Sequence, residues 1–375
     1  MRISWRRILA ILIKEFVQLR RDRLTFAMMV GVPVMQLVLF GYAINGDPKQ
    51  LPTAVVALDQ STFVRSIVRA AENTGYLKVV TTTTEREAER LLALGDVQFV
   101  LLFPGDFSEA LQRGDRPPLV VFADASDPAA TGAAVAALGM LPQVALAHDL
   151  TGPLASLSSD GSPFEVRIHR RYNPEGLTQY NVVPGLMGII LTMTLVMMTA
   201  MAVTRERERG TLENLLATPA RPLEVMIGKI LPYVAIGYGQ VLIVFGAARW
   251  LFDVPMFGSF GLLTAALLLI IVATLCVGFT FSTFAKSQMQ SMQLTMFYFL
   301  PNMLLSGFMF PFRGMPQWAQ VIGEALPLTH FLRMVRGIML KGSTLADVLP
   351  QAWPIAVFIV AVGALSLVRY RQTLD

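Results

Sequence analysis

The residues Val182–Val203, VVPGLMGIILTMTLVMMTAMAV, contain no charged side chain, and the residues after them, Thr204–Leu216, are TRERERGTLENLL. An uncharged run of this length crosses the roughly 30 Å of bilayer hydrocarbon as a helix. Five alternating charges cannot lie in hydrocarbon, so residues 204–229 are predicted to connect two spans at a membrane surface. Leucines at helical spacing after Gly210 predict a short amphipathic helix in this connection. The alternative is a solvated loop whose arginines only set the topology.

The composition of the whole chain agrees with a membrane protein. Of its 375 residues, 54% are hydrophobic and 15% charged, against about 25% charged in an ordinary soluble domain. The mean hydropathy is +0.55. A single cysteine, Cys276, lies inside an apolar run, which excludes an internal disulfide and a cysteine-rich metal site.

The charge is unevenly distributed along the chain. Residues 46–181 hold 11 basic and 16 acidic residues, so the remainder carries a net charge of +10. The basic excess therefore belongs to the segments that flank apolar runs, where it sets membrane orientation. Nucleic acid is excluded as a partner on this ground.

Six uncharged runs predict an α-helical integral membrane protein with six transmembrane helices. Residues 1–23 are basic and amphipathic, which predicts a cytoplasmic helix lying in the membrane interface. Basic residues before the first span, between the second and third spans and after the last place both chain ends in the cytoplasm. Residues 313–347 are interrupted by charges, so two short re-entrant or interfacial helices at the outer surface are expected there instead of a seventh span. The predicted spans are 24–45, Val182–Val203, Ile230–Ala248, Phe257–Ala285, Met292–Phe312 and Val348–Val368.

Residues 46–181 are predicted to form an extracytoplasmic α/β domain inserted between the first and second spans. Strand-like runs alternate with helical stretches, which favours a small, partly parallel sheet with helices on its faces. Asp59 is predicted to cap the first helix, Ser61–Asn73, and Glu85–Leu94 and an alanine-rich stretch from Asp127 predict two more. The predicted strands are Thr53–Leu58, Lys78–Thr82, Val97–Phe103, Leu119–Phe122 and Phe164–Arg170.

No catalytic constellation is found in the sequence. His148, His169 and His330 are isolated, which argues against a histidine-based metal site or triad. The segment Gly337–Thr344 lacks the lysine that follows the second glycine of a phosphate loop, and a helix C-cap is expected there instead. The spans contain no buried charge of the kind an ion-coupled transporter uses. The chain is therefore predicted not to be an enzyme and to bind no cofactor or metal.

Several short motifs together resemble the permease subunit of an ATP-binding-cassette exporter of the type-2 class, in the drug-efflux-like branch with a large external domain. The resemblance extends over the whole chain. It rests on Tyr172–Glu175, Val183–Gly185, Arg205–Glu213, Thr218–Pro219, Glu224, Gly228–Pro232, Leu326–Phe331, Arg336–Gly337 and Leu340–Gly342.

The resemblance implies a subunit of an exporter in a bacterial inner membrane. Its partners would be separate cytoplasmic ATPase subunits, which use the ATP, and a second permease that is identical or a sister. Membrane lipid surrounds such a subunit, and a periplasmic membrane-fusion protein is a further candidate partner. The cytoplasmic loop would couple the ATPase to the spans through Arg205, Glu206, Arg207, Glu208, Gly210, Thr211 and Glu213.

The resemblance also implies a substrate path between the two permeases, for drugs or other amphipathic or hydrophobic compounds. A pliable amphipathic lining is offered by Met292, Gln293, Met296, Tyr298 and Asn302. Methionine and aromatic residues at this spacing more often reflect simple helix packing.

Two other classes of function remain open from the sequence. A membrane sensor would bind a ligand in the α/β domain and relay the signal through the basic loop, but it leaves five further spans unexplained. An ATPase-driven extractor or signal transmitter would use the same machinery without moving a compound across the membrane.

Overall fold

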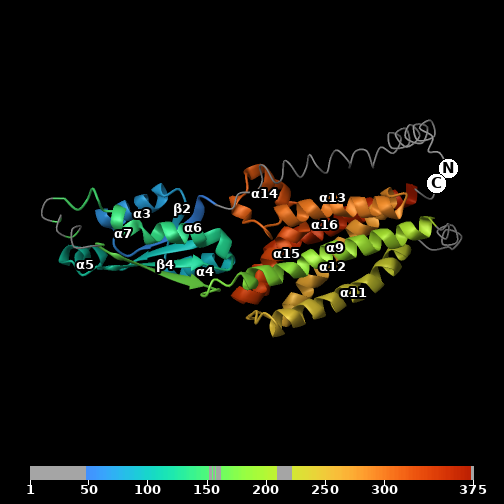
Figure 1. Cartoon of the computed structure of the whole chain (residues 1–375), viewed down its shortest axis with the longest axis horizontal. Helices are drawn as coiled ribbons and strands as arrows, with labels where there is room; N and C mark the ends of the chain where they lie inside the picture. Colours follow the sequence, from blue (N-terminus) through green and yellow to red (C-terminus); the bar gives the residue numbers. More distant parts are fainter. Residues whose placement is uncertain (1–47, 152–153, 155–156, 158–161, 209–221, 373–375) are drawn as a thin grey trace, which may run out of the picture.

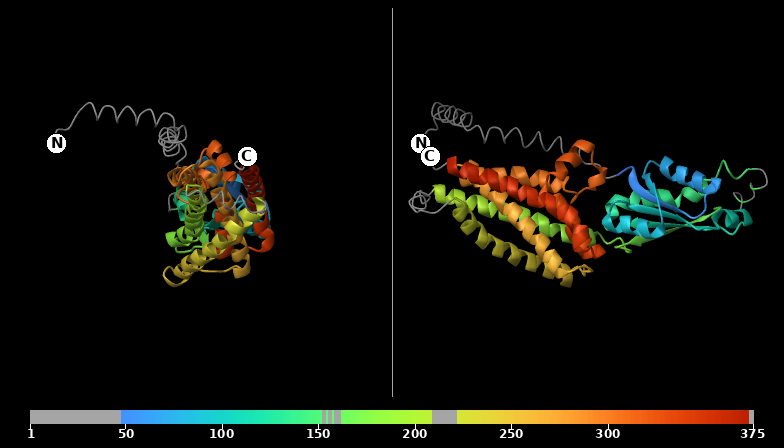
Figure 2. Two further views of the ribbon diagram at one scale, coloured as in Figure 1. Left: turned by 90° about the vertical axis from the view of Figure 1, so that its right-hand side faces the viewer. Right: turned by 180° about the vertical axis from the view of Figure 1, so that it is seen from behind.

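The chain consists of an α/β domain and a bundle of long helices, joined end to end (Figure 1). The computed structural model describes residues 48–151, 154, 157, 162–208 and 222–372. The predicted interface helix 1–23 and first span 24–45 lie outside these residues. In Figure 2 the domain and the bundle lie at opposite ends of the long axis. The sheet region and the apolar helices agree with the predicted fold class.

The α/β domain is built on a five-stranded mixed sheet with strand order β2-β1-β3-β4-β5. β1 pairs in parallel with β2 and β3, β3 pairs antiparallel with β4, and β4 pairs in parallel with β5. All five predicted strands are present, within two residues at each end. The strands are β1 Leu51–Ala57, β2 Leu77–Thr82, β3 Phe99–Phe103, β4 Pro118–Asp124 and β5 Glu165–Arg171.

Helices cover both faces of this sheet. One face carries α3 (Thr62–Asn73), α5 (Phe107–Arg113), α6 (Pro128–Gly139) and α7 (Leu141–Val144), and α4 (Glu85–Leu94) packs on β1 and β3 from the other. Each face therefore buries its own apolar cluster.

Two details of these helices differ from the sequence-based expectation. Asp59 does not cap α3, because the N-cap is Ser61, whose Oγ accepts from the Val64 N–H. The Asp59 carboxylate instead accepts from the backbone N–H groups of Ser61 and Ser108, which ties α3 to α5. α5 itself was not predicted, because its seven residues are too few for a periodic pattern.

The bundle contains five long helices among the described residues. Three of them, α9, α12 and α16, are long and apolar enough to cross a membrane. α11 and α13 are not among these three, so the count of five spans in this region stays a prediction. The helices are α9 Thr178–Glu208, α11 Pro222–Trp250, α12 Phe260–Phe284, α13 Gln288–Leu305 and α16 Leu345–Gln372.

The helix that holds the predicted span Met292–Phe312 ends earlier than the uncharged run does. α13 begins at Gln288, where Ser287 caps it by accepting from the Gln290 N–H, and it ends at Leu305. Gly307 has a φ of 83°, a left-handed conformation that stops the helix and suits glycine. The chain then turns into the short helices.

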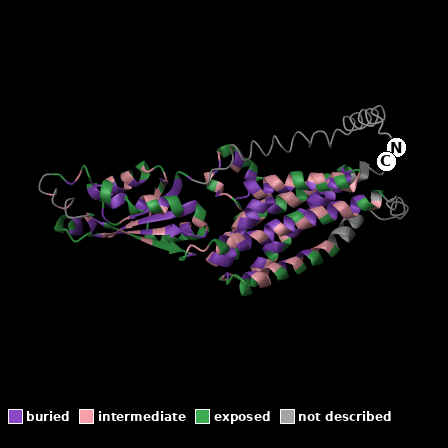
Figure 3. Cartoon of the chain, in the orientation of Figure 1, coloured by how far each residue is buried: buried purple, intermediate pink, exposed green. Residues whose placement is uncertain are grey.

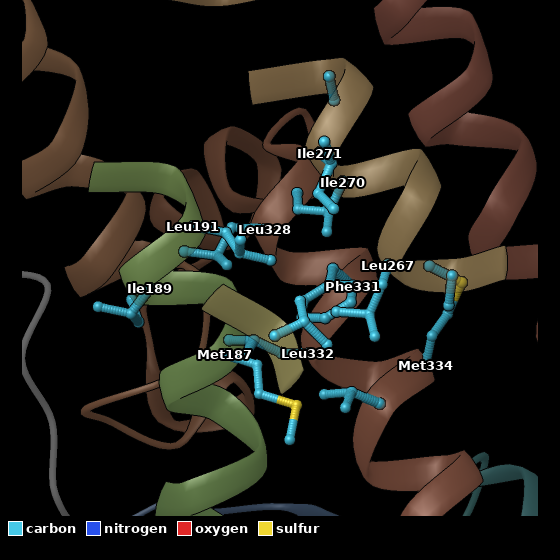
Figure 4. Close-up of a cluster of buried hydrophobic side chains, with 14 of the residues drawn as sticks. Met187, Ile189, Leu191, Leu267, Ile270, Ile271, Leu328, Phe331, Leu332 and Met334 are labelled. Carbon is cyan, nitrogen blue, oxygen red and sulfur yellow. The ribbon is translucent and has the colours of Figure 1, made fainter. Parts of the chain in front are cut away.

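The segment 313–347 forms short helices, as predicted, but one of them lies inside the bundle. α15 (Pro327–Arg336) packs against α9 and α16, and the buried side chains of these elements meet those of α12 (Figure 4). α14 (Gln317–Glu324) precedes α15, and a π-helical turn, η4 (Gly337–Lys341), follows it. All of them lie at the end of the bundle next to the α/β domain (Figure 1).

α12 is the centre of the bundle, since it contacts α9, α16, α11 and α15. Buried residues run along its whole length, whereas α16 is exposed on one side (Figure 3). α12 approaches α9 closely at Gly278, where an added Cβ would lie 2.7 Å from the Val196 carbonyl oxygen and 2.9 Å from the Thr199 Cβ. Only a glycine lets the two backbones come this close.

Gly278→Ala is therefore expected to destabilise the chain by about 1–3 kcal/mol, because the new methyl group meets backbone that cannot move aside. The measurement is the thermal unfolding midpoint of the full chain in detergent. Gly239→Ala on α11 is the matched control, since nothing lies within 4 Å of its added Cβ. Equal midpoints for the two variants would contradict this account of the α9–α12 contact.

Candidate functional site

The charged segment predicted to couple to an ATPase begins as the last turn of α9. Arg205, Glu206 and Glu208 belong to this helix, and so does the backbone of Arg207. The other predicted coupling residues, Gly210, Thr211 and Glu213, lie outside the described residues. The expected short amphipathic helix lies outside them as well.

The end of α9 is tied to the start of α13 through one side chain. Glu208 Oε1 accepts from the Gln288 backbone N–H at 2.8 Å, and Glu208 Oε2 accepts from the Gln288 side-chain amide. These bonds lower the pKa of the Glu208 carboxyl. Arg205 Nε also lies 3.4 Å from Gln288 Oε1. A displacement of the charged segment therefore acts on α13 as well as on α9.

The predicted substrate-path residues do not share one environment. Met292 and Met296 are each 39% exposed on α13, whereas Asn302 is fully buried, and Gln293 and Tyr298 are half-buried. Three side-chain atoms of this set are buried with no hydrogen-bond partner among the described residues. They are the amide oxygens of Gln293 and Asn302 and the hydroxyl of Tyr298. The structure thus divides the set into two exposed methionines and three polar groups that point inward.

The neighbouring helix α9, which is in close contact with α13, carries unpaired polar groups of its own. The buried hydroxyls of Thr192 and Thr199 find no partner among the described residues. Near the charged end of α9, Thr204 shares a hydrogen bond of 2.7 Å with Ser291 of α13. Buried polar groups with unmade hydrogen bonds are rare and costly in an apolar bundle, which marks α9 and α13 as helices with polar contacts not made in this conformation.

A second concentration of polar groups lies where the α/β domain meets the bundle. A cavity of about 500 Å³ there is lined by both parts of the chain. The bundle side contributes four cations. One of them, Arg333, is paired with Glu324, which accepts a hydrogen bond from Arg333 Nη1 at 3.0 Å. The domain side contributes Asp96 and Asp127. The four cations are Arg313, Arg333, Arg336 and Lys341.

The strongest contact across this junction is a buried ion pair. Lys341 Nζ lies 2.6 Å from Asp124 Oδ2, and the two side chains are only 9% and 8% exposed. Lys341 is placed by η4, whose C-cap Gly342 has a φ of 69°, as the expected glycine cap requires. Asp124 is placed as the last residue of β4.

The C-terminal end of α4 contacts two cations of the junction, Lys341 again and Arg313. Lys341 Nζ lies 3.4 Å from the Leu92 carbonyl oxygen, and Arg313 Nη2 donates to the Gly95 carbonyl oxygen at 2.9 Å. The carbonyl oxygens at a helix C-terminus carry a partial negative charge, so both contacts are electrostatically favourable.

Asp127 and Arg336 face each other at the junction without forming an ion pair. Asp127 Oδ1 accepts from Asn181 Nδ2 of α9 at 3.1 Å, and Arg336 Nη1 donates to the Gly307 carbonyl oxygen at 3.2 Å. Burial raises the pKa of the Asp127 carboxyl, and the positive charge of Arg336 opposes that rise. Asp127 therefore ties the start of α6 to the start of α9.

The sequence predicted neither the junction nor the Lys341–Asp124 pair. The available signals were a lysine in an apolar stretch, already noted in the Leu340–Gly342 motif, and an aspartate at the end of a predicted strand. No pattern joins positions 217 residues apart. Among the described residues, no group of three or more His, Cys, Asp or Glu residues could hold a metal ion.

Lys341→Met is expected to destabilise the chain by about 3–5 kcal/mol, because it leaves the Asp124 carboxylate buried without its partner. The double variant Lys341→Met/Asp124→Asn should lose less than the sum of the two single losses. Thermal unfolding of all three variants in detergent measures this coupling. Arg113→Ala, which breaks an exposed pair with Asp115, should leave the unfolding midpoint nearly unchanged. Additive losses at Lys341 and Asp124 would show that the pair is not energetically coupled.

Comparison with known proteins places the chain in a family. Residues 23–368 match the family model described as ABC-2 family transporter protein. The inner membrane transport permease YhhJ of Escherichia coli is 30% identical over 374 residues, covering 96% of each chain. The probable multidrug ABC transporter permease YbhS of the same organism is 27% identical over 350 residues, covering 91% of this chain and 90% of YbhS. The linearmycin resistance permease protein LnrN of Bacillus subtilis is 20% identical, covering 92% of this chain and 94% of LnrN. The chain therefore belongs to the ABC-2 transporter family.

Proposed function

We propose that this chain is the membrane-spanning permease subunit of an ATP-driven exporter. Separate cytoplasmic ATPase subunits hydrolyse the ATP, and a second permease, identical or a sister, completes the membrane part. The chain crosses a bacterial inner membrane six times, with both ends in the cytoplasm and the α/β domain outside. Drugs and other amphipathic compounds are the proposed cargo. The names of its relatives, two of which refer to multidrug transport or drug resistance, support this choice.

The observation that carries the proposal is the hydrogen bonding between Glu208 and Gln288. It links the charged end of α9 to the first turn of α13. These two helices also carry buried polar groups that have no partner among the described residues. A push on residues 204–229 by an ATPase therefore acts on both helices that carry these groups. ATP binding can then shift the population between two arrangements of these helices.

The unpaired polar groups of α9 and α13 suit an uncharged or weakly polar cargo. They are hydroxyls and amides, which would exchange hydrogen bonds with a passing compound without the cost of burying a charge. The exposed Met292 and Met296 lie on the same helix and adapt to cargoes of different shape. A membrane-fusion protein on the extracytoplasmic side is a further proposed partner, which would receive the cargo.

The coupling role is tested by Glu206→Ala/Glu208→Ala in proteoliposomes that contain the chain and its ATPase subunit. The variant should insert and assemble but lose most ATP-driven export, because the tie to Gln288 and the charges offered to the ATPase are removed together. Glu85→Ala/Glu87→Ala on α4 is the matched control, which removes two exposed carboxylates from the α/β domain. If the Glu206/Glu208 variant exports at the wild-type rate, the charged segment only sets the membrane topology and does not couple the ATPase to the spans. ATPase stimulation without any export would favour an extractor or a signal transmitter.

The proposed orientation is tested by cysteine labelling in intact cells. Cys276 is buried, at 2% exposure, and its replacement by alanine gives a thiol-free background. A cysteine at the exposed Gln112 in the α/β domain should react with a membrane-impermeant thiol reagent. A cysteine at Lys286, exposed between α12 and α13, should react only after the cells are opened. The reverse pattern would overturn the orientation, and reaction at both positions in intact cells would refute the span count.

A further inference from the structure

Strand β5 forms an open edge of the sheet. It pairs with β4 on one side only, and the strand order places no strand beyond it among the described residues. An open edge exposes a row of backbone N–H and C=O groups on which another strand can pair. β5 lies along the lower side of the domain in Figure 3, where exposed residues predominate.

The backbone bonds of β5 show which groups face outward. The Glu165 N–H donates to the Pro117 carbonyl oxygen, and the Arg171 carbonyl oxygen accepts from the Ala125 N–H, both at 3.1 Å. Backbone groups alternate in direction along a strand, so the odd-numbered residues face β4. Val166, Ile168 and Arg170 therefore present their N–H and C=O groups at the open edge.

One face of β5 is basic and uncovered. α4 packs mainly on β1 and β3 and reaches β5 through the exposed Glu89–Arg171 ion pair, so Arg167, His169 and Arg171 remain exposed on that face. The Phe122 ring of β4 lies beneath them, with its centroid 5.7 Å from the His169 ring and 4.6 Å from the Arg171 guanidinium. A groove of about 770 Å³ follows this edge and continues past Tyr172 to Pro174.

The charge of the edge selects its partner. The seven residues of β5 include one glutamate and three arginines. Arg167 pairs with Glu165 at 2.8 Å and Arg171 with Glu89 at 3.2 Å, whereas Arg170 makes no ion pair within the described residues. Two copies of this strand would bring a net charge of +2 against another +2, which disfavours self-pairing. A strand with acidic side chains has the opposite charge and meets no such repulsion.

We propose that β5 is a docking site for an extended acidic segment of a partner protein, which adds to the sheet as a sixth strand. Backbone hydrogen bonds to Val166, Ile168 and Arg170 hold the segment in register. Carboxylates at alternate positions meet Arg167 and Arg171, and an apolar side chain covers the Phe122 ring. Binding at this edge is independent of ATP and of the cargo, so it goes beyond the proposed transport function.

The test uses the full chain in detergent and a fluorescein-labelled ten-residue peptide in which valine and glutamate alternate. Fluorescence anisotropy should show saturable binding that weakens with salt. Arg167→Glu/Arg171→Glu should weaken it at least tenfold, whereas Arg65→Glu/Arg69→Glu on the exposed side of α3 should leave it unchanged. A peptide with lysine in place of glutamate should not bind.

A peptide with a modified backbone distinguishes strand addition from simple charge attraction. The same peptide with alternate N-methyl groups keeps its charge but loses the donors that pair with β5, so it should not bind. Ile168→Pro removes an outward N–H while the β4 ladder stays intact, and it should weaken binding at least tenfold. The methylated peptide decides the question even if this variant fails to fold. Absence of binding, or equal binding of the methylated peptide, would overturn the proposal. A dimer that Ile168→Pro dissolves would assign the edge to a second copy of the chain instead.

Discussion

The buried ion pair between Lys341 and Asp124 is the contact on which the placement of the two parts of this molecule depends. Burying two charges is expensive, so such a pair is retained only where geometry and further polar contacts are good. Here the Leu92 carbonyl oxygen at the end of α4 adds a contact to Lys341, and the Ser126 N–H donates to Asp124. If the α/β domain were displaced from the bundle, Lys341 or Asp124 would lie in the junction without its partner. The pair therefore specifies one arrangement more strongly than it adds to stability.

With the domain held in place, α9 becomes a continuous mechanical link through the molecule. Its 31 residues span roughly 46 Å at 1.5 Å per residue. Near its start, Asn181 is bonded to Asp127 of the α/β domain, and at its end Glu208 is bonded to Gln288 of α13. Close packing on α12 at Gly278 keeps the helix in register with the bundle. Forces that act on the charged segment thus reach the junction through one rigid element.

Local patterns predicted most of the elements but few of the contacts between them. Alternating and helical periodicities located all five strands, α4 to the residue, and the apolar helices. The short α5 and the end of α13 were missed, because a two-turn helix has no clear period and a single left-handed glycine stops a helix without changing its hydropathy. The charged residues at 205–208 were found because charge beside an apolar run is a local signal. The Lys341–Asp124 pair joins distant positions, and only the folded chain brings them together.

The Lys341–Asp124 ion pair holds the α/β domain and the bundle in one arrangement. The most direct test is a distance distribution between two spin labels, measured by double electron–electron resonance in the Cys276-free chain. One label would replace the exposed Glu87 of α4 and the other Val321 of α14, which is 66% exposed. We expect a single narrow distribution in the parent chain, and this distribution should broaden when Lys341→Met is added. A distribution that is already broad in the parent chain, or one that Lys341→Met leaves unchanged, would contradict this role of the ion pair.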